Sequence, residues 1–194
     1  MDTDFIDGIS EEFATAIYTE MKLSLFDDIE PKTAIWLLQQ FTRKTYSLDE
    51  TMMMEGEVGN ELFILLSGEA AIKVGGDTVH KFKKGAIIGE SGLAKKTVRR
   101  TATVLAGSSK IQVLVLTREK LDDIKIAMPL IYAEICRNIA DMTIEKLGFA
   151  NDTIQRKIEE TTVAKRKTVE ATRELEHRNW LSRLAATLGF SQGQ

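Results

Sequence analysis

The sequence predicts a mainly β domain that is flanked by helices and followed by a long, charged C-terminal helix. Between residues 46 and 118, short runs of β-branched and aromatic residues alternate with glycines, which favours an antiparallel sandwich or barrel. Before and after this zone, apolar residues recur at spacings of three and four, as in helices. The 194 residues suffice for one domain and an appendage.

Residues 1–46 are the expected N-terminal helical zone. Ser10 precedes two glutamates and an apolar run that begins at Phe13, so it is a suitable N-cap for a first helix. Pro31 stands where a second helix would start, and proline is favoured at the first helical position.

Residues 47–118 are the expected β zone. Gly75-Gly76-Asp77 is suited to a tight hairpin tip. Met52-Met53-Met54 is interpreted as strand or core filler. The clearest candidate strands are 62–66, 71–74, 101–105 and 111–116.

Helical spacing returns at Thr117, and Pro129 marks a helix start or a kink between two helices. Residues 149–194 are expected to be a charged helical stalk with an amphipathic tail. Glycine and proline are absent from 151–178, which favours a continuous helix. A heptad coiled coil fits poorly there, because Lys165 and Thr172 fall on its seam.

The tail at 179–189 differs from the stalk, because its apolar residues share one helical face and Gly189 can end the helix. This face needs a partner. Either it packs on a second protomer or on the β domain, or it docks on a separate output protein or domain or on a membrane surface. The apolar residues are Trp180, Leu181, Leu184, Ala185 and Leu188.

Composition excludes several classes of protein. A net charge of −3 lacks the basic footprint of a nucleic-acid binder. The single Cys136 and the absence of a secretory signal or a long apolar run indicate a cytoplasmic protein without a membrane-spanning helix, and a membrane partner is not expected. His80 and His177 have no partners at metal-ligand spacing, and no catalytic motif is found, so neither a metal site nor an enzyme is expected.

The segment 85–104 carries the most informative constellation. Glycines bracket Glu90, and Arg100 follows ten residues later at the start of a candidate strand. Glycines and a short helical turn let backbone N–H groups approach a phosphate, and an arginine supplies a forked cationic donor. An ionised glutamate only accepts hydrogen bonds, so it suits a sugar hydroxyl. The plain alternative is a glycine turn beside a surface ion pair.

Ordered motifs make residues 25–142 similar to the cyclic-nucleotide-binding domain family, of the catabolite activator and cAMP-dependent kinase regulatory subunit type. Leu25-Phe26-Asp27-Asp28-Ile29 resembles the family's first helix turn. The glycine-spaced run 55–68 resembles its strand pair, and 85–104 resembles its phosphate-binding cassette. The resemblance implies a jelly-roll, or β-roll, of about eight strands flanked by helices, with the whole domain spanning about 20–148.

The resemblance also implies a ligand site for cAMP or cGMP, with cAMP preferred. Glu90 would bind the ribose 2′-OH and Arg100 the cyclic phosphate. Further contacts would come from Gly89, Ser91, Gly92 and Thr101, and Thr143 or Lys146 would contact the base. A cassette shorter by one residue, as in the kinases, would select Arg99 instead of Arg100. The cassette departs from the family in lacking a proline before its arginine and in the basic run 94–97.

These features predict a regulatory module that signals through C-terminal helices. The resemblance implies a homodimer through the helices after Thr117 and an output partner, for which 179–189 is a candidate docking segment. Three alternatives stay open: a regulatory fragment of a larger enzyme, an activator-type transcription regulator and a dimerisation scaffold that binds no nucleotide. The roughly 45 residues after Ala150 lack the pattern of a helix-turn-helix domain, which argues against the second. Arg100→Ala is expected to weaken binding and to leave the fold intact, as for a surface cassette.

Overall fold

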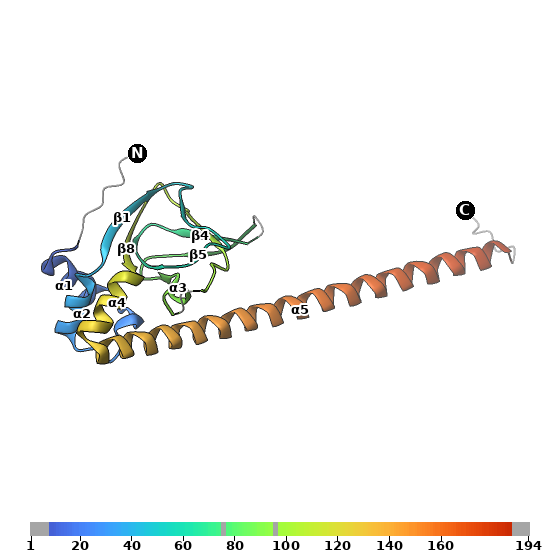
Figure 1. The fold of residues 1–194 in the computed structure, drawn as a ribbon. Coiled ribbons are helices and arrows are strands. Elements are labelled where there is room, and N and C mark those ends of the chain that lie inside the picture. The colour runs from blue at the N-terminus through green and yellow to red at the C-terminus, as the bar shows by residue number, and fades with distance from the viewer. Residues whose placement is uncertain (1–7, 75–76, 95–96, 188–194) are drawn as a thin grey trace. The chain divides into compact units, whose positions relative to one another are not determined.

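The computed structural model describes residues 8–74, 77–94 and 97–187, and the chain divides into two compact units, Met1–Ile144 and Glu145–Gln194. Figure 1 shows the first unit as a β-roll with α1, α2 and α4 gathered beside it. The helices are α1 (Glu11–Glu20), η1 (Ser24–Phe26), α2 (Pro31–Leu38), α3 (Glu90–Ala94), α4 (Arg118–Ala127) and α5 (Pro129–Thr187). The strands are β1 (Thr42–Ser47), β2 (Thr51–Met53), β3 (Glu61–Ser67), β4 (Ala70–Val74), β5 (Asp77–Phe82), β6 (Ile87–Ile88), β7 (Thr103–Ala106) and β8 (Lys110–Thr117).

The roll consists of two four-stranded sheets, ordered β1-β8-β3-β6 and β2-β7-β4-β5. The paired strands are antiparallel, as the glycine-punctuated pattern predicts. Strand β4 pairs with β5 from Val74 opposite Asp77, while Gly75 and Gly76 of the expected hairpin tip lie outside the described residues. The expectation of a β-roll with flanking helices and a long C-terminal helix is confirmed.

Strand β3 explains why the sequence shows an unbroken apolar run there. Successive side chains of a strand point to opposite faces. Phe63 and Leu65 face the interior of the roll, together with Tyr46, Met53 and residues of β8. Leu62, Ile64 and Leu66 belong to a second core under the helices. Both faces are therefore buried, and alternation disappears from the sequence.

The helices of the first unit begin where the sequence predicts. The Ser10 side chain accepts a hydrogen bond from the Phe13 amide, and Pro31 is the first residue of α2. Thr117 caps α4, and Pro129 begins α5. On α5, the buried Asn138 amide donates to the carbonyl oxygens of Leu25 and Asp27 at 3.0 and 2.8 Å, which fixes the start of α5 against η1.

The expected helical zone 1–46 is wrong at its end, because β1 begins at Thr42. Thr42 and Thr45 are β-branched, and Tyr46 packs into the roll interior with its ring 6.5 Å from that of Phe63. The pairing of β1 with β8 is a long-range contact, which local periodicity does not reveal. Likewise β7 begins at Thr103 instead of residue 101, because Thr101 and Ala102 form a bend that leads out of the cassette.

Helix α5 extends from the first unit into the second. Its residues 129–144 contribute Ile135, Ile139 and Met142 to the core under the helices. Within 145–187, which make up the described part of the second unit, the large apolar side chains are 41–65% exposed. The expected continuous charged helix over 151–178 is confirmed, whereas Leu188 and Gly189 lie outside the described residues.

Candidate functional site

The cassette segment turns at Gly89, between β6 and α3. Gly89 has a φ of 82°, a left-handed backbone conformation that favours glycine. A Cβ added there would lie 2.5 Å from Nη1 of Arg100 and 2.9 Å from the carbonyl oxygen of Glu61. Glycine at this position therefore provides both the turn and the space for an arginine side chain.

Arg100 is the central polar residue of the site, with 9% of its surface exposed. Its Nη1 donates to the carbonyl oxygen of Gly89 at 2.9 Å, and its Nη2 donates to that of Glu61 at 2.7 Å. A guanidinium carries five N–H donors, so these bonds use two of them. The side chain thus joins the cassette turn to the start of β3. Arg100 is therefore buried and not at the surface, as was expected, whereas an intact fold in Arg100→Ala stays a prediction.

Two further glycines form the slot in which this guanidinium lies. A Cβ on Gly59 would be 2.9 Å from Cζ of Arg100 and equally close to the Gly92 Cα. A Cβ on Gly92 would be 2.8 Å from Nη1. The Arg100 amide also donates to the carbonyl oxygen of Glu57 at 2.7 Å, which fixes the backbone beside the slot. Gly59 and Gly92 therefore lie in contact with each other, and both backbone segments approach the guanidinium closely.

The electrostatic environment of Arg100 is acidic. Burial lowers the pKa of Arg100, and the carboxylates of Glu61, Glu90 and Glu57 act in the opposite direction. Glu90 is 7% exposed, and Glu61 also forms an ion pair with Lys44 at 3.2 Å. A buried cation beside several carboxylates is compensated, so the site tolerates the charge of Arg100 without a ligand.

The cassette is also connected to the helices that follow the roll. Arg118, the first residue of α4, donates from its backbone amide to the carbonyl oxygen of Asn60 at 2.8 Å. Its Nη2 donates to the carbonyl oxygen of Gly92 in α3. Leu93 of α3 is 2% exposed and belongs to the same core as Ile124 of α4. A movement of α3 would therefore be transmitted directly to α4.

The remaining residues predicted from sequence lie around this centre in different ways. Ser91 is half-buried in α3, whereas Thr101 is exposed in the bend before β7. The Arg99 guanidinium donates to the carbonyl oxygen of Gly56 at 2.7 Å. Thr143 lies on α5, where its hydroxyl donates to the carbonyl oxygen of Ile139 at 2.7 Å.

The structure therefore brings Gly89, Glu90, Gly92 and Arg100 together. The hydrogen bond from the Thr143 hydroxyl lies within α5. Ser91 and Thr101 border the group in sequence. The basic run 94–97 falls largely outside the described part of the chain, which omits Lys95 and Lys96.

Sequence reasoning missed three parts of the site. Glu61 participates through its carbonyl oxygen, for which the sequence carries no side-chain signal. Gly59 falls within the glycine-spaced run 55–68, and the sequence carries no signal of its close approach to Gly92 and Arg100. Arg118 follows the Thr117 cap and looks like an ordinary first-turn helix residue.

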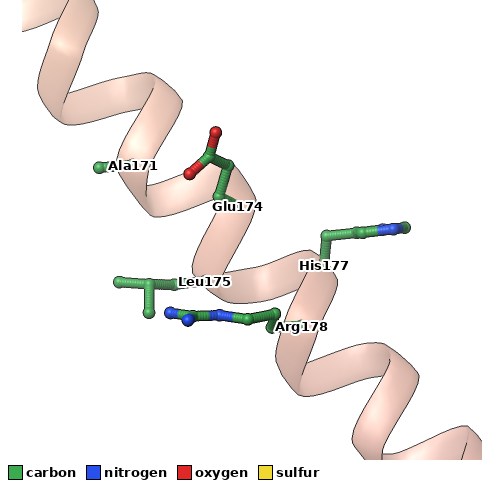
Figure 2. A pocket seen from close by; sticks show the side chains of 5 residues that line it. All are labelled: Ala171, Glu174, Leu175, His177 and Arg178. Atoms are coloured by element: carbon green, nitrogen blue, oxygen red, sulfur yellow. The ribbon is translucent and has the colours of Figure 1, made fainter.

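Other kinds of site receive no support from the described residues. They contain no group of three His, Cys, Asp or Glu side chains that could hold a metal ion. None of the helices in the described ranges is apolar over a stretch long enough to span a bilayer. Figure 2 shows a recess on α5 that is lined only by residues of that one helix: Ala171, Glu174, Leu175, His177 and Arg178. Small-molecule sites are enclosed clefts, so we assign no ligand to it.

Comparison with known proteins identifies the class of the roll. Residues 43–125 match the family model of the cyclic nucleotide-binding domain. This part of the chain is therefore similar to the cyclic nucleotide-binding domain family. A cGMP-dependent protein kinase from Eimeria tenella is 29% identical over 98 residues, which are 50% of this chain and 10% of the kinase. The match thus concerns one segment of a much longer relative.

Solved structures share the fold. A cyclic nucleotide-binding domain from Methylobacillus flagellatus aligns with a TM-score of 0.66 and 23% identity, covering 79% of this chain and 89% of its own. The catabolite activator protein of Thermus thermophilus aligns at 0.57 and 23%, covering 68% and 62%. The regulatory subunit of a cAMP-independent protein kinase A from Trypanosoma brucei aligns at 0.53 and 20%, covering 62% and 43%. At these identities the likeness concerns the fold alone.

Proposed function

We propose that the roll binds a cyclic purine nucleotide, with cAMP as the first candidate and cGMP as the second, and that binding regulates an output through the C-terminal helices. The observation that carries the proposal is the buried pair of opposite charges in one cassette: Arg100 in its glycine slot and Glu90 at the start of α3. The family match of residues 43–125 supports a cyclic nucleotide as the ligand class.

The chemistry of this pair suits a phosphorylated sugar. Arg100 uses two N–H groups to fix the cassette, and the others would meet the oxygens of the cyclic phosphate. Glu90 would accept a hydrogen bond from the ribose 2′-OH, since a carboxylate beside a phosphate needs a donor. Gly89, Ser91, Gly92 and Thr101 would complete the sugar-phosphate contacts. In this proposal Thr143 on α5 would approach the base.

Isothermal calorimetry of the whole chain with cAMP and cGMP, and with 5′-AMP as control, tests the ligand class. Micromolar binding of one cyclic nucleotide and much weaker binding of 5′-AMP is the expected result. This result would also identify the purine base, adenine or guanine, that the roll prefers. The absence of heat with all three nucleotides on folded protein would refute the proposal.

Glu90→Gln isolates the ribose contact, because it removes a charge and keeps the size of the side chain. Charge-assisted hydrogen bonds contribute about 1.5–3 kcal/mol, so affinity should fall about tenfold or more. Glu57→Gln is the matched control. It removes a carboxylate that also interacts with Arg100 but is exposed and lies outside the cassette helix. Equal losses in both variants would show that only the local charge matters.

A second candidate role for Arg100 is favoured by its two bonds to backbone carbonyl groups. In this reading the arginine is a structural strut, and the domain is a dimerisation scaffold without a nucleotide. Arg100→Lys distinguishes the roles, because lysine keeps the charge for a phosphate but cannot bridge two carbonyl groups with a planar fork. A strut alone predicts a lower melting temperature in the variant and no nucleotide binding in the parent chain.

The signal would leave the cassette through α4. Arg118 holds the Gly92 carbonyl group, and Leu93 packs in the core that α4 and the start of α5 complete. Ordering of α3 around a ligand would shift these helices if the ligand binds the two arrangements with different affinity. We further propose a homodimer through the helices after Thr117, an output partner at 179–189, and a regulatory, non-enzymatic role in the cytoplasm without nucleic-acid binding. In a longer parent protein, the same module would regulate an attached enzyme.

A further inference from the structure

The second unit carries an apolar repeat that heptad analysis does not detect. Large apolar residues stand at intervals of eleven along the helix, at Leu147, Ile158, Val169 and Trp180. Eleven residues make about three turns of a helix, so at 3.6 residues per turn each stripe residue is offset from the previous one by only about 20°, and the four side chains form one slowly winding stripe. The side chains are 58%, 53%, 53% and 55% exposed, which is the exposure of a surface without a cover.

The residues next to the stripe extend it. Ile154 lies four positions before Ile158, and Leu184 lies four positions after Trp180. Thr161 and Thr172 stand three positions after a stripe residue, where their hydroxyl groups are used inside the helix, on the carbonyl oxygens of Lys157 and Thr168. With the main-chain carbonyl groups as their partners, these threonines present mainly methyl groups to a neighbour.

We propose that residues 147–184 pair with the same segment of a second copy of this chain, parallel and in register, in a coiled coil with an eleven-residue repeat. This inference deepens the homodimer part of the proposed function and depends on it. A sustained eleven-residue repeat gives a right-handed or nearly straight supercoil, and a partner helix must carry the same period to remain in contact. A second copy carries that period by identity.

The charged residues that flank the stripe also favour a second copy of this chain, and they favour the parallel direction. Lys157 and Glu159 lie on either side of Ile158, about 100° from it in opposite directions. In a parallel pair, Lys157 of each copy faces Glu159 of the other. At the other three stripe positions, the two flanking residues never carry charges of the same sign. An antiparallel pair with Ile158 opposite Val169 would instead place Glu159 of one copy beside Glu170 of the other.

Two seam positions weaken this association. Lys165 and Glu176 lie four residues before Val169 and Trp180, close to the axis of the pair. A charged residue near the seam costs stability and restricts oligomer state, although its aliphatic stem can cover apolar neighbours. The structure therefore assigns a dimer that dissociates reversibly, which suits a segment that transmits a signal.

Sedimentation equilibrium of the whole chain tests the stripe with matched valines. Val169→Asp places a carboxylate on the stripe, and the dimer dissociation constant should rise at least tenfold. Val163→Asp makes the same exchange six residues earlier, roughly 120° around the helix, at a site of similar exposure, and should change the constant by less than about twofold. Leu175→Asp tests whether the helices instead pair through a heptad seam. Leu175 continues the heptad seam from Ile154 and lies off the stripe.

The results separate the possible packings. A loss with Leu175→Asp and none with Val169→Asp would establish the heptad seam and overturn the proposal. Equal effects of Val163→Asp and Val169→Asp, or a parent chain that is monomeric at about 100 μM, would overturn it too. Calorimetry with cAMP and cGMP on the same samples tests nucleotide binding separately. Because the oligomer test needs no ligand, the dimer proposal can fail while the nucleotide-binding proposal holds, and the reverse.

A charge exchange tests the direction. Lys157→Glu alone and Glu159→Lys alone each bring like charges together across a parallel pair, and each should weaken the dimer about threefold. The double variant Lys157→Glu, Glu159→Lys restores both attractions and should bind better than the two single effects predict. Residues two apart do not face each other within one helix, so this recovery would come from the other copy. Additive losses would exclude the parallel register.

Discussion

The two units of the chain use similar residues in opposite ways. In the roll, Leu65 is fully buried between the sheets, whereas Leu175 of the second unit is 50% exposed. The first unit builds its own core from both faces of β3. The second unit contains one helix, which has no core of its own. Isolated helices gain little stability from their own hydrogen bonds, which is why we propose a partner for the second unit and none for the core of the first.

Polar groups differ between the units in the same way. In the first unit, Arg100 and Asn138 are buried and join segments that are far apart in sequence. In the second unit, Thr161, Thr162 and Thr168 donate to carbonyl oxygens four residues earlier in their own helix. Long-range polar contacts thus define the site, while local ones only accompany the helix.

The largest difference should come from the same truncation in each unit. Leu65→Ala opens a cavity in the roll and should lower the free energy of unfolding of the first unit by about 2–5 kcal/mol. Leu175→Ala removes a half-exposed side chain from the face opposite the stripe and should cost less than about 1 kcal/mol. Urea titration measures both. Trp36 reports on the first unit and Trp180 on the second, so Trp→Phe variants separate the signals. Comparable costs in the two variants would contradict the division into a self-sufficient and a dependent unit.

A pH titration sharpens the comparison at the roll interior. Burial, with Glu61 and Glu50, raises the pKa of Tyr46 to about 12. The folded state therefore holds this proton above pH 10, where the unfolded state loses it. Stability should fall from pH 10 upward by about 2–3 kcal/mol and level off above pH 12. Tyr46→Phe removes this fall in the Trp36 signal. An unchanged fall in that variant would assign it to other groups.

The sequence predicts the strands of the core better than those at the edges. The runs 62–66 and 111–116 appear as apolar segments because β3 and β8 are central strands with buried faces. Strands β1, β2 and β5 border their sheets and mix polar and apolar residues, and β6 has only two residues, Ile87 and Ile88. Their pairing is determined by tertiary contacts, which a local pattern does not encode.

The site shows the same limit. Gly89, Glu90 and Arg100 can be predicted from the sequence because the candidate site requires these particular residue types. By contrast, the carbonyl oxygens of Glu61 and Gly92 are backbone atoms that every residue carries. The burial of Arg100 depends on the approach of 56–59, which is thirty residues distant from the cassette in sequence. Only the folded chain reveals that the candidate phosphate ligand is also a structural link.

Two glycines with similar backbones test how crowded the slot is. Gly89 and Gly56 have φ values of 82° and 84°, but an added Cβ meets Arg100 only at Gly89 and nothing within 4 Å at Gly56. Gly56→Ala should cost about 1 kcal/mol from backbone strain. Gly89→Ala should cost about 1–2 kcal/mol more and should abolish nucleotide binding. Equal costs, measured by urea titration, would show that the Arg100 side chain moves freely out of the slot.

The smallest effect concerns the connection between the cassette and the helices. Arg118→Met keeps much of the aliphatic stem and removes the bond to the Gly92 carbonyl group. The loss should be about 1 kcal/mol, or roughly fivefold in nucleotide affinity, because one neutral acceptor loses its charged donor. Arg99→Met is the matched control. Arg99 also donates to a backbone carbonyl oxygen, but its bond joins the cassette to Gly56 and not to α4. If Arg118 transmits the signal, its variant should also reduce any nucleotide-dependent change in dimer dissociation, whereas Arg99→Met should leave that change intact. A full response in Arg118→Met would place the connection in the Leu93 packing instead.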